Sequence, residues 1–198
     1  MPGMNPANET SIAQSEETVL VPRLHWWRYS WTGAQASTTS ATCIHTTITL
    51  TTSIQVFTDM TQPTCPRALS VTGAAAQTGD TVTIRGTDIH DHPITEIITT
   101  VASTKVAGLL AFKSITSLTC SPYVSGSTPT LTVGDTNLLG LPVLLPAAAC
   151  VFASYKSGTL EGTAATVTVS TTIPAANTIL LNSSLDGSII AAIGYIYG

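Results

Sequence analysis

The densest group of metal-capable side chains in the sequence is His90-Asp91-His92, with Asp88 and Glu96 close by. Imidazole and carboxylate groups bind zinc and other transition metals, and His90 and His92 would share one face if they lay in a strand. The local sequence is instead typical of a turn, in which Asp and His are ordinary residues. We therefore expect a hairpin turn at which His90 and His92 contact a partner subunit, and we expect no metal site.

No other pattern in the sequence supports catalysis or cofactor binding. A serine nucleophile is expected within Gly-x-Ser-x-Gly, and neither Ser125-Gly126-Ser127 nor Lys156-Ser157-Gly158 matches that motif. The glycine-rich motifs that bind nucleotide phosphates are absent from the sequence. Paired carboxylates for glycoside hydrolysis would have to come from only eleven acids. We expect no enzymatic activity, no cofactor and no small-molecule substrate.

The four cysteines are Cys43, Cys65, Cys120 and Cys150, and none forms a Cys-x-x-Cys pair. Their spacing does not match a zinc site, although two disulfides in any of three pairings are possible. The first 22 residues contain no Lys or Arg and no apolar segment typical of a signal peptide. We therefore expect synthesis in the cytoplasm and free thiols.

All three tryptophans lie within residues 24–31, directly after a polar segment that contains three glutamates. Trp, Tyr and Arg dominate the energetics of protein interfaces. This segment either fills the core of its own domain or anchors on a neighbouring subunit, and it does both if it closes one end of the domain. The candidate interface residues are Trp26, Trp27, Arg28, Tyr29 and Trp31.

Composition excludes several classes of protein. Only 9% of residues are charged, the net charge is −4 and the mean hydropathy is +0.33, whereas 36 Thr and 19 Ser make up more than a quarter of the chain. Disorder requires lower hydrophobicity, nucleic-acid binding requires clustered cations, and coiled coils are rich in Lys and Glu. The longest apolar stretch, residues 138–153, is interrupted by Gly140, Pro142 and Pro146, so we expect no membrane span.

Threonine alternates with Ile, Val or Leu along much of the chain, which is typical of β-strands. The alternation predicts strands within residues 38–58, 67–72, 80–85, 94–101, 113–119, 131–133, 149–155 and 163–173. We expect residues 106–112 to be a loop, with at most two helical turns within 102–110, and a bulge or burial on both faces at Ile97-Ile98. Asp186-Gly187, between apolar segments 179–181 and 189–197, predicts a hairpin.

Short strands separated by Gly, Pro and Asp turns favour a β-sandwich or barrel. We therefore predict an all-β protein of about nine to eleven short strands with an extended N-terminal arm. Residues 1–37 would form the arm, with the aromatic anchor at 24–31, and residues 38–198 would form the β-domain.

Four consecutive segments resemble a pattern found in structural proteins of tailed-bacteriophage virions. They are PRALSVTG at residues 66–73, GDTVTIRGTD at 79–88, PITEIITT at 93–100, and residues 106–117, which contain AFKSITS. The resemblance covers about 50 residues, a quarter of the chain. It departs from the pattern at His90-Asp91-His92, where a small Asn-Gly type of turn is usual, and in the short loop before Lys105.

The resemblance implies a virion structural protein. The acidic, aromatic-anchored arm favours a capsid decoration, or cement, protein that binds the major capsid protein and copies of itself, as a dimer or trimer on the capsid surface. A tail, collar or fibre component is the first alternative, and a carbohydrate-binding or adhesive β-module is the second.

Overall fold

The computed structural model describes residues 23–30, 39–75, 77–124, 129–156, 158–183, 185 and 190–197, and within 23–30 and 190–197 it describes the backbone. These residues form fourteen strands and two short 3₁₀ helices, η1 (Ala148–Cys150) and η2 (Pro174–Ala176). The predicted all-β class is confirmed. The described strands outnumber the nine to eleven predicted because several are only two or three residues long.

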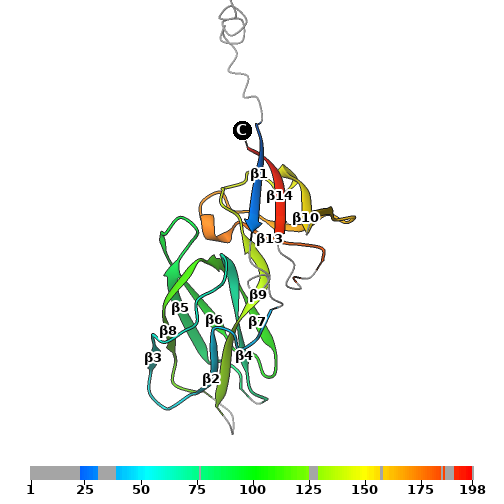
Figure 1. Cartoon of the computed structure of the whole chain (residues 1–198). Helices are drawn as coiled ribbons and strands as arrows, with labels where there is room; N and C mark the ends of the chain where they lie inside the picture. Colours follow the sequence, from blue (N-terminus) through cyan, green and yellow to red (C-terminus); the bar gives the residue numbers. More distant parts are fainter. Residues whose placement is uncertain are drawn as a thin grey trace, which may run out of the picture.

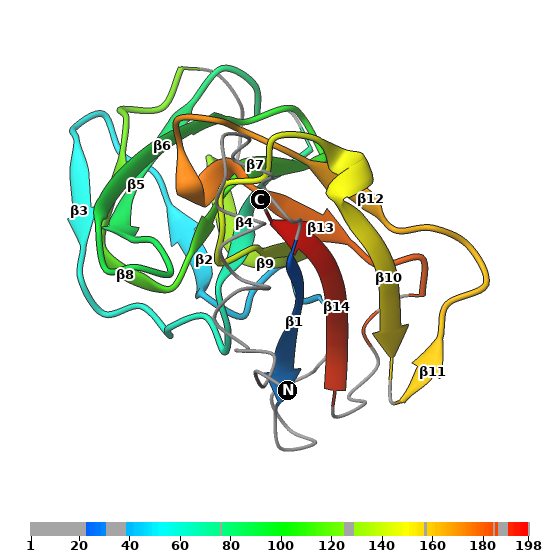
Figure 2. The same cartoon turned by 90° about the horizontal axis from the view of Figure 1, so that it is seen from above.

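The strands form three sheets that curl into a half-barrel (Figures 1 and 2). Sheet A has the order β1 (Arg23–Ser30), β14 (Ile190–Tyr197), β10 (Val151–Lys156) and β11 (Thr159–Leu160). Sheet B has the order β12 (Thr166–Thr168), β13 (Thr178–Leu180), β9 (Thr130–Gly140), β4 (Arg67–Gly73) and β7 (Lys105–Phe112), and β2 (His45–Thr49) also pairs with β9. Sheet C has the order β3 (Gln55–Phe57), β8 (Ser114–Cys120), β5 (Thr81–Thr87) and β6 (Pro93–Thr99).

The strand β5 illustrates why the threonine-rich segments fold as sheets. Val82 and Ile84 are fully buried, whereas Thr83 and Arg85 point to the opposite, outward face. This alternation follows from the two-residue period of a strand. The inward side chains of sheet C pack against those of sheet B and form the lower core in Figure 1.

The long strand β9 connects two hydrophobic cores (Figure 1). Its first half pairs with β2 and contributes Leu131 and Val133 to the lower core. Its last residues pair with β13, and Leu139 enters a smaller upper core. The same strand therefore packs in both cores.

Both neighbours of β4 bulge at the same level. Between positions 67 and 69, β4 advances two residues while β9 advances four, from Leu139 to Asp135. Between positions 68 and 70, β7 likewise advances four residues, from Ala111 to Ala107. Each bulge leaves backbone groups without a ladder partner, so other groups must satisfy them.

Arg67 satisfies the bulge in β9. It is fully buried, its Nη1 donates to Asp135 Oδ2 at 2.6 Å, and its Nε donates to the Thr136 carbonyl at 2.9 Å. The other Asp135 carboxylate oxygen accepts the Ser40 backbone N–H at 2.9 Å. The Asp135 carbonyl accepts the Lys105 ammonium at 2.6 Å. This network, at the point where β9 passes between the cores, holds β4, β7, β9 and the segment before β2 together.

Glu96 satisfies the bulge in β7. Its carboxylate reaches from β6, the edge of sheet C, and accepts the backbone N–H groups of Leu109 and Leu110. Burial raises the pKa of Glu96, and the two backbone hydrogen bonds only partly offset this rise. A Cβ on Gly108 would overlap the Glu96 carboxylate, so a larger residue there must displace this carboxylate from the N–H groups that it accepts. Glu96 therefore joins the edges of two different sheets.

Three local predictions were wrong. Residues 106–112 belong to strand β7, in which Ala, Gly and Leu occupy both inward and outward positions, so the residue types do not alternate as they do in β5. At Ile97-Ile98 the β5–β6 register is continuous, with Ile97 64% exposed and Ile98 buried, so there is neither a bulge nor burial on both faces. The segments that flank Asp186-Gly187 do not form a hairpin, because β13 pairs with β12 and β9 whereas β14 pairs with β1 and β10.

The predicted N-terminal arm lies partly outside the described residues. Residues 1–22 and 31–38 are not described. The backbone of residues 23–30 forms β1, which pairs antiparallel with β14 of the same chain over its full length. The two described helices are single 3₁₀ turns, and neither is long enough to cross a membrane.

The four cysteines are free thiols, as expected. Burial raises the pKa of Cys65 and of Cys120 to about 11. Burial also raises the pKa of Cys43, and the Asp135 charge adds to the effect. Cys43, Cys65 and Cys120 therefore stay protonated at neutral pH, and they pack as small apolar groups.

We expect Arg67→Met to lower the free energy of unfolding by about 3–5 kcal/mol, because it leaves the Asp135 carboxylate buried without its cation. Urea denaturation measures this change. Lys113→Met is the matched control, since Lys113 forms an exposed pair with Asp91 at 2.8 Å and should cost less than ~1 kcal/mol. Equal losses in the two variants would contradict the role assigned to Arg67.

We expect Gly108→Ala to destabilise the protein by about 1–3 kcal/mol, the usual cost of inserting a methyl group into a filled space. Because the methyl group would overlap the Glu96 side chain, its cost should largely disappear in a Glu96→Ala background. A double-mutant cycle in urea measures the coupling. Additive effects would show that Glu96 does not impose the glycine.

Candidate functional site

The loop that carries His90 and His92 is closed by Asp88. The Asp88 side chain is buried, and its Oδ1 accepts the backbone N–H groups of His90 at 2.8 Å and His92 at 2.9 Å. The Asp88 N–H donates to the His92 carbonyl at 2.9 Å, and Asp91 adopts a left-handed backbone with φ of 65°. The predicted turn is confirmed, and Asp88 serves to organise its backbone.

The two imidazoles lie on the surface of this loop with their rings 6.0 Å apart. His90 Nε2 lies 2.9 Å from the Pro142 carbonyl in the loop after β9, whereas His92 Nδ1 lies 3.5 Å from Asp88 Oδ2. Within the described residues, no three His, Cys, Asp or Glu side chains are arranged to hold a metal ion. His90 thus fastens the turn to the segment after β9, and His92 remains largely exposed.

The predicted aromatic anchor lies on the outer strand of sheet A. The backbones of Trp26, Trp27, Arg28 and Tyr29 pair with residues 191–194 of β14. Trp31 lies outside the described residues. The structure therefore places the anchor backbone at a sheet edge, away from the loop that carries His90 and His92 (Figure 1).

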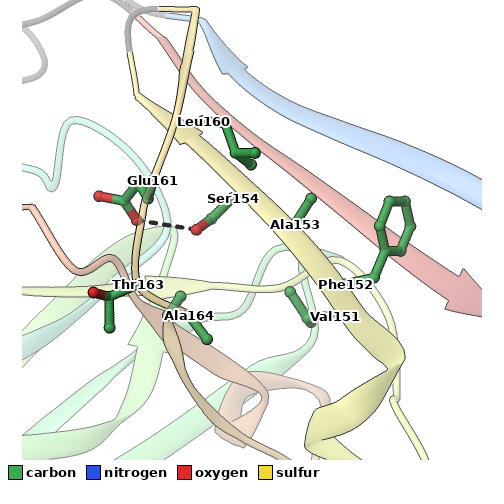
Figure 3. Close-up of a pocket in the computed structure, with 9 residues that line it drawn as sticks. Val151, Phe152, Ala153, Ser154, Leu160, Glu161, Thr163 and Ala164 are labelled. Carbon is green, nitrogen blue, oxygen red and sulfur yellow. Dashed lines mark hydrogen bonds between the residues drawn. The ribbon is translucent and has the colours of Figure 1, made fainter.

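A cavity of about 220 Å³ lies beside β10 in the upper part of the molecule (Figure 3). Val151, Ala153, Leu160 and Ala165 give it apolar walls, and Glu161 faces Ser154 across it. The Ser154 hydroxyl donates to Glu161 Oε2 at 3.0 Å, and the backbone N–H groups of residues 182 and 183 donate to the same carboxylate. Glu161 thereby fastens the chain after β13 to sheet A.

The pKa of Glu161 is lowered. Partial burial acts to raise it, but the hydrogen bonds from Ser183, Ser154 and Asn182 together outweigh the cost of desolvation. The carboxylate is therefore held in its charged form. Its role is that of an acceptor, because a proton donor in catalysis requires a raised pKa.

Glu161 is one example of a general use of acids in this protein. Of the seven described carboxylates, five accept backbone N–H groups and so close loops, bulges or chain crossings. The five are Asp80, Asp88, Glu96, Asp135 and Glu161. The other two, Asp59 and Asp91, lie near His45 and Lys113. The described carboxylates therefore stabilise separate loops, bulges and chain crossings, and they do not cluster at one site.

The outward surface of sheet C is the best candidate for binding a partner. We call it the threonine face and define it by Val56, Thr119, Thr83, Ile97 and Arg85. The first four lie directly opposite one another on β3, β8, β5 and β6. Val56 is 62% exposed and Ile97 is 64% exposed. The face carries one charged residue and is partly apolar, which are properties of a surface that a partner covers.

Arg85 is the charged residue of the threonine face. It is exposed, and its Nη1 donates to the Thr119 hydroxyl at 3.3 Å. Sequence reasoning did not single out Arg85 or this row of side chains. The alternation in β5 places Arg85 outward, but only the strand order of sheet C brings it between Val56 and Ile97.

Comparison of the chain with protein-family models, with curated proteins and with solved structures finds no match.

We expect Glu161→Gln to reduce the acid sensitivity of the protein. A carboxyl whose folded pKa lies below its unfolded value adds stability above the unfolded pKa, and that stability is lost as the pH falls through the folded pKa. Because Glu161 is only partly buried and solvent screens its charge, the variant should lose less than ~1 kcal/mol at pH 6 and melt lower by less than the roughly 2–4 °C that ~1 kcal/mol produces in a domain of this size. The gap should close towards pH 3.

Thermal melts from pH 6 to pH 3 measure this difference. Asp59→Asn is the control, because the Asp59 side chain is 78% exposed and lies 3.8 Å from His45. A gap between wild type and Glu161→Gln that stays constant with pH would contradict the role of the Glu161 charge.

Proposed function

We propose that this chain is a non-enzymatic structural protein of a virion, and more specifically a capsid decoration protein. In this role it binds the major capsid protein and copies of itself on the capsid surface, after synthesis in the cytoplasm of the host. It acts mechanically, by joining neighbouring subunits of the shell.

The observation that carries the proposal is the use of the charged side chains. Five of the seven described carboxylates bind backbone N–H groups, and the buried Arg67 pairs with Asp135. These charged side chains therefore stabilise strands and loops. Few described charged side chains remain for general acid–base catalysis or for a hydrated outer surface. A rigid, weakly charged β-protein suits permanent assembly, because few charges must be desolvated when its surface is covered.

The threonine face supports the same proposal. Its exposed apolar residues Val56 and Ile97 and its hydroxyl-bearing neighbours Thr83 and Thr119 offer apolar contacts and hydrogen bonds to a protein partner. The resemblance of residues 66–117 to phage structural proteins overlaps this region, since the segment contains β5, β6 and the first part of β8. A place in the capsid is proposed ahead of a place in the tail, collar or fibre because of the acidic segment that precedes β1.

Immunogold electron microscopy tests the proposal. Antibodies raised against the purified chain are applied to virus particles released from cells that encode it, and we expect gold particles distributed over the heads. Labelling confined to tails or fibres would contradict the decoration role but keep the virion role. Absence of label from intact and detergent-opened particles would contradict both.

A binding experiment distinguishes the remaining alternative, an adhesive carbohydrate-binding module. The purified chain is incubated with empty capsids and, separately, with immobilised cell-surface glycans. Saturable binding to capsids without binding to glycans is the expected result, and the reverse would replace the proposal.

A further inference from the structure

The threonine face carries an unpaired positive charge. Arg85 has the Thr119 hydroxyl as its hydrogen-bond partner, and no described carboxylate forms an ion pair with it. Exposed apolar side chains, Val56 and Ile97, lie on the outer strands β3 and β6 of the same face. A complementary partner would therefore combine negative charge with apolar side chains over a short distance.

The chain itself contains such a segment directly before β1. Residues 16–22 read Glu-Glu-Thr-Val-Leu-Val-Pro, so that two acids precede three consecutive apolar residues. No Lys or Arg occurs before Arg23, so the segment has no competing cation. Its charge and its apolar content both complement the threonine face.

The length of the segment before β1 also agrees with the width of the threonine face. The row from Val56 to Ile97 crosses four neighbouring strands, which is three interstrand steps of ~4.8 Å, or roughly 14 Å. An extended chain advances ~3.3 Å per residue, so the four steps from Glu17 to Val21 cover about 13 Å. A segment of this length can place an acid near Arg85 while its apolar residues cover Val56 or Ile97.

We propose that residues 16–22 of one copy bind the threonine face of a second copy. Glu16 and Glu17 pair with Arg85, and Val19, Leu20 and Val21 cover Val56 or Ile97. This assignment goes beyond the proposed function because it names one self-association contact, whichever larger structure the protein joins.

The position of β1 favours a second copy over the same chain. β1 begins at Arg23, paired with Tyr197, at the end of the molecule farthest from sheet C (Figure 1). A segment that leaves this end reaches the sheet C of a neighbour placed head to tail without turning back along its own molecule. Such a contact is heterologous, so it generates rings or filaments.

Charge reversal in the full-length chain tests the inference. Sedimentation velocity over a range of concentrations measures self-association of the wild type, of Arg85→Glu, and of the double variant Glu16→Lys with Glu17→Lys. We expect each variant alone to associate at least tenfold more weakly than the wild type, because each opposes like charges. Association of the wild type should weaken with salt.

Mixing the two variants gives the decisive result. The unchanged acids of the Arg85→Glu chain meet the unchanged Arg85 of the other chain, and the introduced lysines meet the introduced glutamate. Heterotypic assembly should therefore return, although neither variant assembles alone. No restoration on mixing, or a wild type that is monomeric at every concentration, would overturn the inference.

Two controls separate this contact from general effects of charge. Glu9→Lys changes an acid outside residues 16–22 and should leave association unchanged, and Arg85→Lys should retain most of it. Circular dichroism and melting temperature confirm that the exposed Arg85 can be changed without loss of fold. Because the experiment uses only the purified chain, it can fail while capsid labelling succeeds, and the reverse also holds.

Discussion

The buried ion pair between Arg67 and Asp135 is the interaction on which the arrangement of the two cores depends. A charge can be buried only when it is paired and hydrogen-bonded, and this pair meets that condition with bonds to Thr136 and Ser40. The pair lies where β9 bulges between the lower and the upper core. The guanidinium bonds the Thr136 carbonyl of the bulge, while Lys105 and Ser70 bond the Asp135 carbonyl, so one continuous strand can pack in both cores. Because β9 packs in both cores, the ion pair helps to set the position of one core relative to the other.

Other carboxylates also form hydrogen bonds with backbone groups that have no partner in a sheet ladder. Glu96 satisfies the bulge of β7 and joins sheet C to sheet B, Asp88 closes the loop of His90 and His92, and Glu161 holds the chain after β13. In each case a carboxylate replaces a missing partner in a ladder or loop. The consequence for function is that most of the described carboxylates bind backbone N–H groups of the protein itself. The outward face of sheet C is left with threonines, two apolar side chains and Arg85, which is a surface suited to contact with protein.

Sequence reasoning succeeded where apolar and polar residue types alternate along a strand and failed where they do not. In β5 the alternation of Val82 and Ile84 with Thr83 and Arg85 is visible in the sequence and is reproduced in the burial pattern. In β7 the burial alternates, but Gly108 lies inward and Leu109 is 70% exposed, so the residue types do not reveal the strand and the segment was predicted as a loop. Ile97-Ile98 showed the opposite error, because an exposed isoleucine on an outward face has the same sequence signal as a bulge. The acceptor that makes the β7 bulge possible, Glu96, lies on another strand, which local periodicity does not reveal.

The sequence by itself determined the all-β class, the position of most strands, the turn at His90 to His92 and the near-neutral surface, because these depend on residue type and on the two-residue period of a strand. Only the tertiary structure decided which strands pair, and thus that Val56, Thr119, Thr83 and Ile97 form one row. It also decided that Arg67 meets Asp135 across 68 residues of chain. Pairings of this kind depend on non-local burial and on the satisfaction of backbone groups, and a linear pattern carries no information about which distant residue supplies the partner.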